Sequence, residues 1–487
     1  MAKDLTYGIE SHHTSSLEGS ARPTLDSPLR RVRIAGASGK LGLYLAVPIL
    51  AAALTSAGCG EEPMASDIDE CATDNGGCGA PESATCTNNP GAAPTCTAVP
   101  TLDTTGLRAD APPYAVHGPF WVGHRQFEAA GDPGAKPLSI RAWYPALNPT
   151  RAKEEVTYQF TPHLAMLGGD TPFVVHGHAI LDAPIDATKG ARPLVIFSHG
   201  YSLNPEWYST LLEHYASQGF IVLAPQHAED DWLEAWAATF DRPLDIKRAL
   251  DFAEGLTAPG GELAGKIDMT NVAVVGHSYG GYTALAMAGA QLELDTFHKR
   301  CAALAPDAPE GFLCAPFVGR EKDMAARAGL SSVPQGLWPA LGDSRIKAIV
   351  PIAGSAFLFN AGLASIKVPM MAIGGTADST GPWEWTTGLS YDNVSSAHKA
   401  LVGIENAEHM IPINPCDMMP WSDALDPFTQ GYLCLDPVWD RPRTLDLINH
   451  FSTAFLLDVL TGDTAAHQAL SSDAVQLPGI GYTTTLQ

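Results

Sequence analysis

A serine flanked by glycines is the first feature of this 487-residue chain that could do chemistry. Residues 276–280 read Gly-His-Ser-Tyr-Gly, after an apolar run at 272–275 and before an alanine-rich segment at 282–290. These flanks predict a buried strand, a tight turn and a helix. Gly276 and Gly280 are needed because side chains there would collide across so sharp a turn. The pattern predicts that Ser278 is a nucleophile presented on a strained turn.

A serine hydroxyl is a poor nucleophile until a base takes its proton, and that base needs a carboxylate to orient it. Asp378 follows an apolar run that begins at Met370, and His409 follows another that begins at Ala400. Both therefore lie just past predicted strands, in the chain order serine, aspartate, histidine. We predict Ser278, Asp378 and His409 as the catalytic residues.

Other residues compete for the roles of base and acid. His277 is adjacent to the serine in a turn that points successive side chains apart, and His199 is better explained as a structural residue beside a glycine turn. Among carboxylates, Asp392 and Glu405 are the alternatives to Asp378, but neither follows a strand that ends in glycine. Gln226 and His227 are expected to pack behind the site rather than to act in it.

An acyl-transfer site also needs two hydrogen-bond donors for the negative oxygen that forms in the transition state. One is expected to be the backbone N–H of Tyr279, directly after the nucleophile. The other is expected to be the N–H of Tyr201, after the turn His199-Gly200. Both donors are main-chain groups, so the tyrosine side chains are free to line the pocket.

Apolar runs alternate with helical spacing along most of the chain. Helices are expected at 207–215, 244–256 and 443–460, and strands at 137–145, 193–200, 220–224, 345–352, 368–373 and, as the last, 400–404. Such alternation predicts an α/β fold with a mostly parallel sheet and helices on both faces. Residues 146–190 look irregular, and their histidines fit a surface loop better than a metal site: His163, His176 and His178.

The segment 291–345 breaks the alternation. It is rich in proline and poor in strand signals, so we expect an inserted cap over the active-site end of the sheet. A disulfide between Cys301 and Cys314 is expected to staple it, which would contribute roughly 3 kcal/mol. A second pair, Cys416 and Cys434, is expected to clip the loop before the last helix.

The amino terminus carries the signs of export. Residues 1–59 form a polar stretch, an arginine pair and an apolar run that ends in Ser56-Ala57-Gly58-Cys59. This ending resembles a bacterial lipobox and predicts lipid attachment at Cys59; a plain cleaved signal and an uncleaved anchor are the alternatives. The eight other cysteines are an even number, as suits an oxidising compartment. The expected location is the cell envelope, through a lipid anchor, or the medium.

Residues 60–97 resemble a truncated calcium-binding EGF-like module, on the text Asp-Ile-Asp-Glu-Cys, Asn-Gly-Gly-Cys and Ala-Thr-Cys-Thr-Asn with a closing Cys96. The resemblance implies two disulfides, Cys71–Cys86 and Cys78–Cys96, and a structural calcium near Asp67, Glu70 and Asn88. The family's third disulfide is missing and Pro94 replaces an aromatic residue, so a stalk without metal is the alternative. Residues 98–114 read as a linker.

Residues 115–487 are expected to form one hydrolase domain. Phe-Ser-His-Gly at 197–200, Gly-His-Ser-Tyr-Gly-Gly at 276–281 and Asn-Ala-Glu-His at 406–409 resemble α/β-hydrolases of the platelet-activating-factor acetylhydrolase and dienelactone hydrolase group, which is related to cutinases and polyester hydrolases. The resemblance implies carboxylic ester hydrolysis through an acyl-enzyme, without a catalytic cofactor. Ser278 replaces the cysteine of dienelactone hydrolases proper, which disfavours their substrate.

We therefore expect a secreted serine carboxylesterase that acts on small acyl or lipid-like esters. A serine peptidase of the prolyl-oligopeptidase type and an inactive surface binding protein are the alternatives. The net charge of −24 and the pI near 4.9 disfavour nucleic acid and anionic lipid as partners and favour a solvated acidic surface. Phospholipid, polyester and small esters all stay open as substrates, and the oligomeric state stays unknown.

Overall fold

The computed structural model describes residues 69–78, 84–131, 136–161, 173–186, 188–229 and 231–486. The predicted export segment with Cys59, the expected calcium ligand Asp67 and the side chain of Glu70 lie outside the described part, as does His163. Within that part, no helix combines the length and apolar character needed to span a bilayer.

A ten-stranded sheet forms the centre of the large region after residue 115, in the order β14-β13-β12-β11-β10-β8-β9-β4-β3-β7. Neighbours from β9 through β8 and β10 to β13 pair in parallel, whereas β3, β4 and β9 pair antiparallel, as do β13 and β14. The sheet is thus mostly parallel, as predicted. Its strands are β3 (Trp121–Ala129), β4 (Leu138–Ala146), β7 (Ile180–Leu181), β8 (Arg192–Ser198), β9 (Ile221–Pro225), β10 (Ile267–His277), β11 (Ile346–Ile352), β12 (Met370–Gly375), β13 (Lys399–Ile404) and β14 (Ile480–Thr484).

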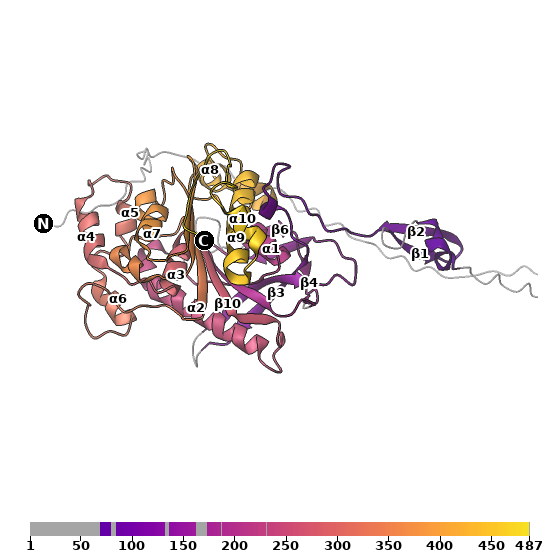
Figure 1. Cartoon of the computed structure of the whole chain (residues 1–487), viewed down its shortest axis with the longest axis horizontal. Helices are drawn as coiled ribbons and strands as arrows, with labels where there is room; N and C mark the ends of the chain where they lie inside the picture. Colours follow the sequence, from indigo (N-terminus) through magenta and orange to yellow (C-terminus); the bar gives the residue numbers. More distant parts are fainter. Residues whose placement is uncertain are drawn as a thin grey trace, which may run out of the picture. The chain divides into compact units, whose positions relative to one another are not determined.

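Helices cover both faces of this sheet, because side chains of its buried strands alternate between two apolar cores. Val195 and Phe197 of β8 point into one core together with α1 (Ser209–Ser217) and α9 (Arg441–Thr461). Leu194 and Ile196 point into the other with α2 (Ala235–Thr257) and α3 (Tyr279–Met287). Figure 1 shows the first pair of helices on one side of the strands and the second pair on the other.

Helix α2 begins at Ala235, well before the expected start at 244, and passes through Pro243. A proline inside a helix leaves the carbonyl four residues earlier without its usual donor. Here that carbonyl belongs to Thr239, and it accepts a hydrogen bond of 3.1 Å from the Tyr282 hydroxyl on α3. The tertiary contact replaces the lost helical bond, which explains how the helix continues through the proline.

Two other expectations were wrong. Residues 146–190 contain an antiparallel pair, β5 (Val156–Phe160) and β6 (Phe173–Gly177), as well as the short strand β7. The strand at 400–404 is not the last, since β14 adds to its edge near the carboxyl end. β7 and β14 pair with strands that are distant in the chain, which local residue patterns do not reveal.

The structure contains all four expected disulfides. Cys71–Cys86 and Cys78–Cys96 link the segment that holds β1 (Ala84–Asn89) and β2 (Ala92–Ala98). Cys301–Cys314 joins α4 (Leu294–Ala303) to α5 (Gly311–Cys314), which α6 (Glu321–Arg327) follows. Cys416–Cys434 closes the loop that carries α8 (Pro427–Cys434).

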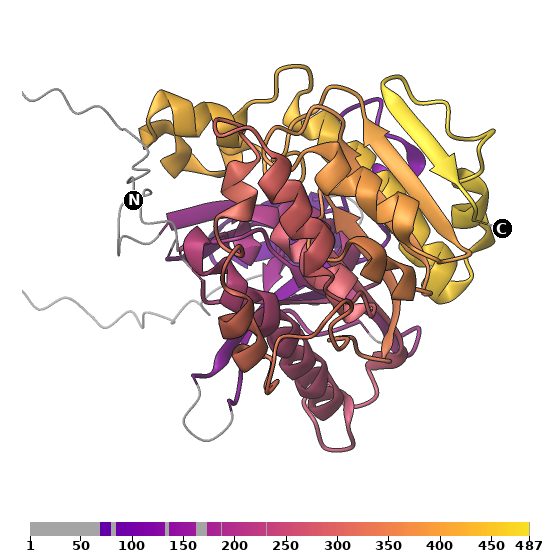
Figure 2. The ribbon, with the colours of Figure 1, turned by 90° about the vertical axis from the view of Figure 1, so that its left-hand side faces the viewer.

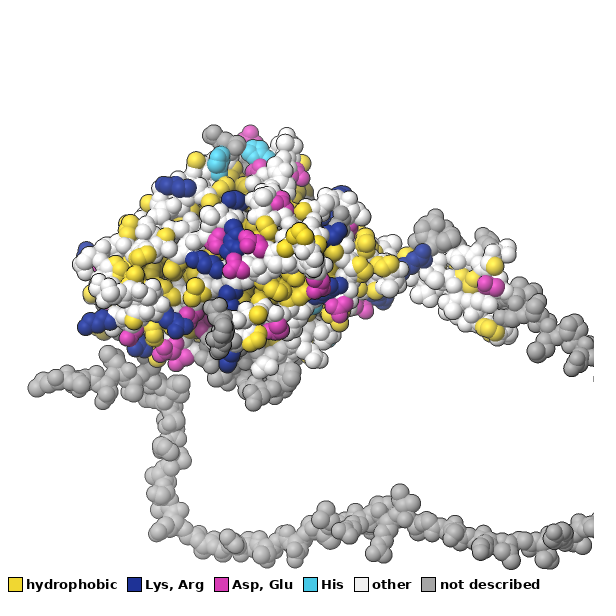
Figure 3. All heavy atoms as spheres, turned by 90° about the horizontal axis from the view of Figure 1, so that it is seen from below, with side chains coloured by type: hydrophobic (Ala, Val, Ile, Leu, Met, Phe, Trp, Pro, Cys, Tyr) yellow, Lys and Arg dark blue, Asp and Glu magenta, His cyan; other side chains and the backbone are white. Residues whose placement is uncertain are grey.

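The segment 291–345 contains the three short helices α4, α5 and α6, joined by loops. Figure 2 shows its helices, in salmon and orange-red, in front of the strands of the sheet. The face seen in Figure 3 carries acidic and basic side chains interspersed among apolar ones.

Candidate active site

Ser278 lies between the end of β10 and the start of α3 with φ 57° and ψ −118°. Such a backbone conformation costs on the order of 1–3 kcal/mol for a residue with a side chain. The surrounding backbone holds it in place: the Ser278 N–H donates to the Ile352 carbonyl at 2.9 Å, and the Ser278 carbonyl accepts from Ser355 N–H at 3.0 Å. The turn is therefore fixed by the neighbouring strand β11 and the loop after it.

The two glycines of the motif are required by close backbone contacts. A Cβ atom at Gly276 would lie 2.2 Å from the Gly280 carbonyl oxygen, and one at Gly280 would lie 1.9 Å from the Ser198 carbonyl oxygen. Both distances are far inside van der Waals contact, so the residue types at 276 and 280 follow from the geometry of the turn.

The three predicted catalytic residues form a continuous hydrogen-bonded chain. The Ser278 Oγ atom lies 2.9 Å from Nε2 of His409, and Nδ1 of His409 lies 2.7 Å from Oδ2 of Asp378. His409 and Asp378 are buried, whereas Ser278 is partly exposed. A base is thus within reach of the serine proton and is itself oriented by a carboxylate, which is the arrangement that activates a hydroxyl.

Asp378 is held on its other side by backbone amides. Its Oδ1 atom accepts hydrogen bonds from Thr380 N–H at 3.0 Å and from Gly381 N–H at 2.6 Å. These two donors fix the rotation of the carboxylate, so Oδ2 faces His409. The alternatives Asp392 and Glu405 make no such contact with His409 in the described structure.

His277 points away from the serine. Its Nε2 donates to the backbone carbonyl of His409 at 3.0 Å, and its Nδ1 lies 2.8 Å from the Tyr208 hydroxyl, which itself accepts from Gly200 N–H at 3.1 Å. Burial lowers the pKa of His277 well below its usual value. This neutral side chain therefore links the loop of His409 to the turn at Gly200 and does not act as a base for Ser278.

The two expected oxyanion donors lie on opposite sides of the serine in the chain and near it in the fold. Among the described residues, no acceptor is assigned to the amide of Tyr201 or of Tyr279. Tyr279 is the first residue of α3, where an amide has no acceptor within the helix and the helix dipole favours negative charge. The Tyr279 side chain is buried, and its hydroxyl donates to the Ala235 carbonyl at 3.0 Å. This side chain therefore does not line the pocket, although it was expected to be free to do so.

A cavity of about 380 Å³ opens over Ser278 and His409. One part of its wall comes from the turn at Tyr201 and from Trp232, another from Phe312 and Leu313 of α5, and a third from α8. Its described lining residues include no aspartate, glutamate, lysine or arginine and are mostly apolar or aromatic: Gly200, Tyr201, Leu203, Trp232, His277, Ser278, Phe312, Leu313, Ser355, Thr380, Gly381, His409, Met410, Phe428, Thr429, Tyr432 and Leu433. The site suits an uncharged, apolar ligand.

Each disulfide-closed segment in the large region after residue 115 reaches this cavity. Leu313 is adjacent to Cys314 of the first, and Leu433 is adjacent to Cys434 of the second. The rim also includes Phe428, which is 84% exposed. These two disulfides thus constrain the segments that form two of the apolar walls of the cavity.

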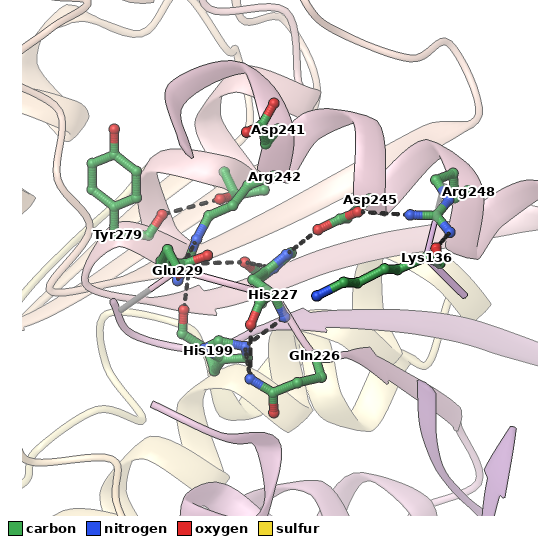
Figure 4. Close-up of polar contacts among 12 residues, drawn as sticks. Lys136, His199, Gln226, His227, Glu229, Asp241, Arg242, Asp245, Arg248 and Tyr279 are labelled. Atoms are coloured by element: carbon green, nitrogen blue, oxygen red, sulfur yellow. Dashed lines mark hydrogen bonds and ion pairs between the residues drawn. The ribbon is translucent and has the colours of Figure 1, made fainter. Parts of the chain in front are cut away.

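A second polar network lies behind the turn at His199, and Figure 4 shows it. His199 is buried and its Nε2 accepts from the backbone N–H of His227 at 3.0 Å, which agrees with the expected structural role. His227 lies 3.0 Å from both Ser198 Oγ and Asp245 Oδ2. This serine–histidine–aspartate set resembles the one at Ser278 in composition, but Ser198 is completely buried in β8 and cannot meet a substrate.

Sequence reasoning missed Arg242, which donates to the Gly200 carbonyl, and Tyr208, whose hydroxyl accepts from the Gly200 N–H. Neither belongs to a motif, and each reaches the turn only through the packing of its helix. The histidines His176 and His178, expected on a surface loop, lie on and just after β6. No group of metal-binding side chains occurs in the residues that the structure describes.

Comparison with known proteins relates part of this region to one family. Residues 179–308 match the family model described as Chlorophyllase. Two curated relatives, "Chlorophyllase-1, chloroplastic" of Citrus unshiu and of Citrus sinensis, are each 36% identical over 119 residues, which is 22% of this chain and 34% of theirs. The chain thus matches about a third of the length of these relatives. The matched region contains β8, α2 and Ser278, whereas Asp378 and His409 lie beyond it.

Proposed function

We propose that this protein is a serine carboxylesterase with an α/β-hydrolase fold. The observation that carries the proposal is the chain of hydrogen bonds from Asp378 through His409 to Ser278, of which His409 and Ser278 line an apolar cavity. The partial match to chlorophyllases, an α/β-hydrolase-type family, supports hydrolysis of ester bonds. The finer resemblance to platelet-activating-factor acetylhydrolases and dienelactone hydrolases stays a prediction.

In the proposed reaction, His409 Nε2 takes the Ser278 proton while Oγ attacks the ester carbonyl. Asp378 keeps the proton of His409 on Nδ1 and stabilises the imidazolium that forms. The amides of Tyr201 and Tyr279 bind the oxyanion of the tetrahedral intermediate. His409 then gives its proton to the leaving alcohol. In the second half of the reaction, water attacks the acyl-enzyme while His409 takes its proton, and His409 returns a proton to Ser278 as the acid leaves.

The proposed substrates are uncharged esters with an apolar acyl or alcohol group. A charged group that entered this cavity of about 380 Å³ would lose its hydration and would find no charged side chain in the wall with which to form an ion pair. We propose the segment 291–345 as a cap, because it contributes Phe312 and Leu313 to the cavity. Export with a lipid anchor at Cys59, the EGF-like character of the 60–97 module and calcium at that module stay proposals from the sequence.

A direct test compares the purified protein with its Ser278→Ala variant on p-nitrophenyl acetate and butyrate. We expect turnover by the parent protein and its loss in the variant, together with loss of labelling by a fluorophosphonate. Ser355→Ala is the matched control, since Ser355 lines the same cavity and no histidine partner is assigned to its hydroxyl within the described structure. Equal turnover by the parent and Ser278→Ala would rule out the proposed mechanism, and turnover of peptide anilides in place of esters would favour the peptidase alternative.

A further inference from the structure

A buried guanidinium lies directly behind the turn that offers the Tyr201 amide. Arg242 of α2 is completely buried, and its Nη1 atom donates to the His199 carbonyl at 2.6 Å. Its Nη2 atom donates to the Gly200 carbonyl at 3.1 Å. Figure 4 shows the Arg242 side chain extending toward His199 and toward Glu229, its ionic partner.

The bond to Gly200 has a consequence for the neighbouring amide. The Gly200 carbonyl and the Tyr201 N–H belong to the same planar trans peptide group, in which the two bonds point in opposite directions. A donor that holds the carbonyl on the side of α2 therefore aims the N–H away from α2. Tyr201 and Ser278 line the cavity, whereas Arg242 is not among its lining residues.

The same carbonyl receives a second donor. His199 Nδ1 lies 2.8 Å from the Gly200 oxygen, so the peptide group is polarised by a neutral imidazole as well as by a cation. Donors on a carbonyl increase the positive character of the N–H at the other end of the peptide. The Tyr201 amide is thus both oriented and strengthened as a donor.

Arg242 also contacts both residues whose amides are the expected oxyanion donors. Its guanidinium carbon lies 5.8 Å from the centre of the Tyr201 ring and 5.5 Å from that of the Tyr279 ring. Glu229 accepts from its Nε at 2.8 Å and balances its charge. A lysine could keep the charge but could not hold two carbonyls and a carboxylate in one plane.

We propose that Arg242 is a positioning residue that sets the orientation of the Tyr201 amide in the oxyanion site. The inference rests on the proposed esterase function. It assigns to Arg242 no contact with substrate: the guanidinium acts through the Gly200–Tyr201 peptide group. The effect should therefore fall on the transition state and spare the binding of the ground-state ester.

The test measures kcat and KM for p-nitrophenyl butyrate with Arg242→Gln, Arg242→Lys and the control Arg248→Gln. Arg248 lies on the same helix and bonds Asp245 Oδ1 at 3.2 Å and the Lys136 carbonyl at 3.0 Å, and it donates to neither carbonyl of the turn. We expect Arg242→Gln to lower kcat by about 100-fold with KM within about threefold, as for loss of one oxyanion donor. Arg242→Lys should recover part of that loss, and Arg248→Gln should match the parent.

A trifluoromethyl ketone inhibitor provides the second readout, because its bound oxyanion needs the same donors as the transition state. Its affinity should fall with Arg242→Gln by about the same factor as kcat. If Arg242→Gln leaves Glu229 unpaired and fails to fold, Arg242→Lys and the double variant Arg242→Gln/Glu229→Gln take its place, with folding checked by circular dichroism.

Unchanged kcat in folded Arg242 variants, a loss confined to KM, or an equal loss in Arg248→Gln would overturn the inference. These results differ from failure of the proposed function, in which the parent protein itself turns over no ester and takes no fluorophosphonate label. In that case the inference falls with the function. Active parent enzyme with unaffected Arg242 variants would remove the inference alone.

Discussion

Replacing Asp378 by asparagine should abolish most of the proposed esterase activity, because it changes which ring nitrogen of His409 carries the proton. In the parent protein, Oδ1 of Asp378 accepts from two backbone amides and Oδ2 faces His409 Nδ1 at 2.7 Å. An asparagine in this place must keep its carbonyl oxygen on the two amides, because turning its NH₂ toward them would leave donors facing donors. Its NH₂ group therefore faces Nδ1 of His409.

An amide NH₂ at that position can only donate, so Nδ1 of His409 must become the acceptor and its proton moves to Nε2. A protonated Nε2 cannot take the proton of Ser278. The loss of the correct tautomer lowers kcat by about 10⁴-fold in comparable sites, which corresponds to about 5.4 kcal/mol of transition-state stabilisation. KM should change little, because Asp378 does not line the cavity.

Steady-state kinetics on p-nitrophenyl butyrate would measure this loss, and nitrogen NMR of His409 would report which ring nitrogen carries the proton. Asp392→Asn is the control, since Asp392 is an exposed carboxylate on α7 (Thr387–Asn393) without a bond to His409 in the described structure. Retention of more than a tenth of the parent kcat by Asp378→Asn, or a proton still on Nδ1, would refute this reasoning.

Three other perturbations address the turn, the buried charge and a disulfide. Gly280→Ala should abolish activity and destabilise the fold by about 1–3 kcal/mol, because its Cβ would lie 1.9 Å from the Ser198 carbonyl oxygen; thermal unfolding and fluorophosphonate labelling measure both effects. Burial raises the pKa of Glu213 from 4.5 to about 8, so the native state binds this proton more tightly than the unfolded chain does. Tm should therefore fall as pH rises from 4.5 to 8. Glu213→Gln should flatten the part of this fall in Tm that lies between pH 7 and 8. Replacing Cys416 and Cys434 by serine should lower Tm. It should also reduce kcat/KM for the hexanoate ester about tenfold relative to the acetate ester, because α8 would lose apolar contact with the longer acyl chain. A tenfold loss corresponds to roughly 1.4 kcal/mol.

Each of these predictions has a control in the same chain. Gly311→Ala adds a Cβ with nothing within 4 Å and should leave both stability and activity unchanged. Glu155→Gln removes an exposed carboxylate that lines the same surface cavity as Glu213 and should preserve the pH dependence. Removal of Cys71 and Cys86 should leave the hexanoate-to-acetate ratio unaltered, since their segment does not line the cavity. A changed ratio there, or a flattened Tm profile in Glu155→Gln, would contradict the corresponding assignment.

The residue pattern alone predicted the α/β class and the three residues of the relay. Both depend on local features: apolar runs that end in a turn, glycines where a backbone approaches closely, and an acid and a base placed just after such runs. Because the carboxyl ends of parallel strands share one edge of a sheet, this information suffices to bring Ser278, Asp378 and His409 together.

Other features were decided only by tertiary structure. Helix α2 continues through Pro243 because Tyr282 on another helix supplies the missing donor, and β14 exists because β13 offers it an edge. Arg242 belongs to no sequence motif and lies outside the helix that the residue pattern predicted at 244–256. Its place behind the Gly200 carbonyl follows from the packing of α2 on the sheet, and contacts between residues 42 positions apart in the chain cannot be inferred from local spacing.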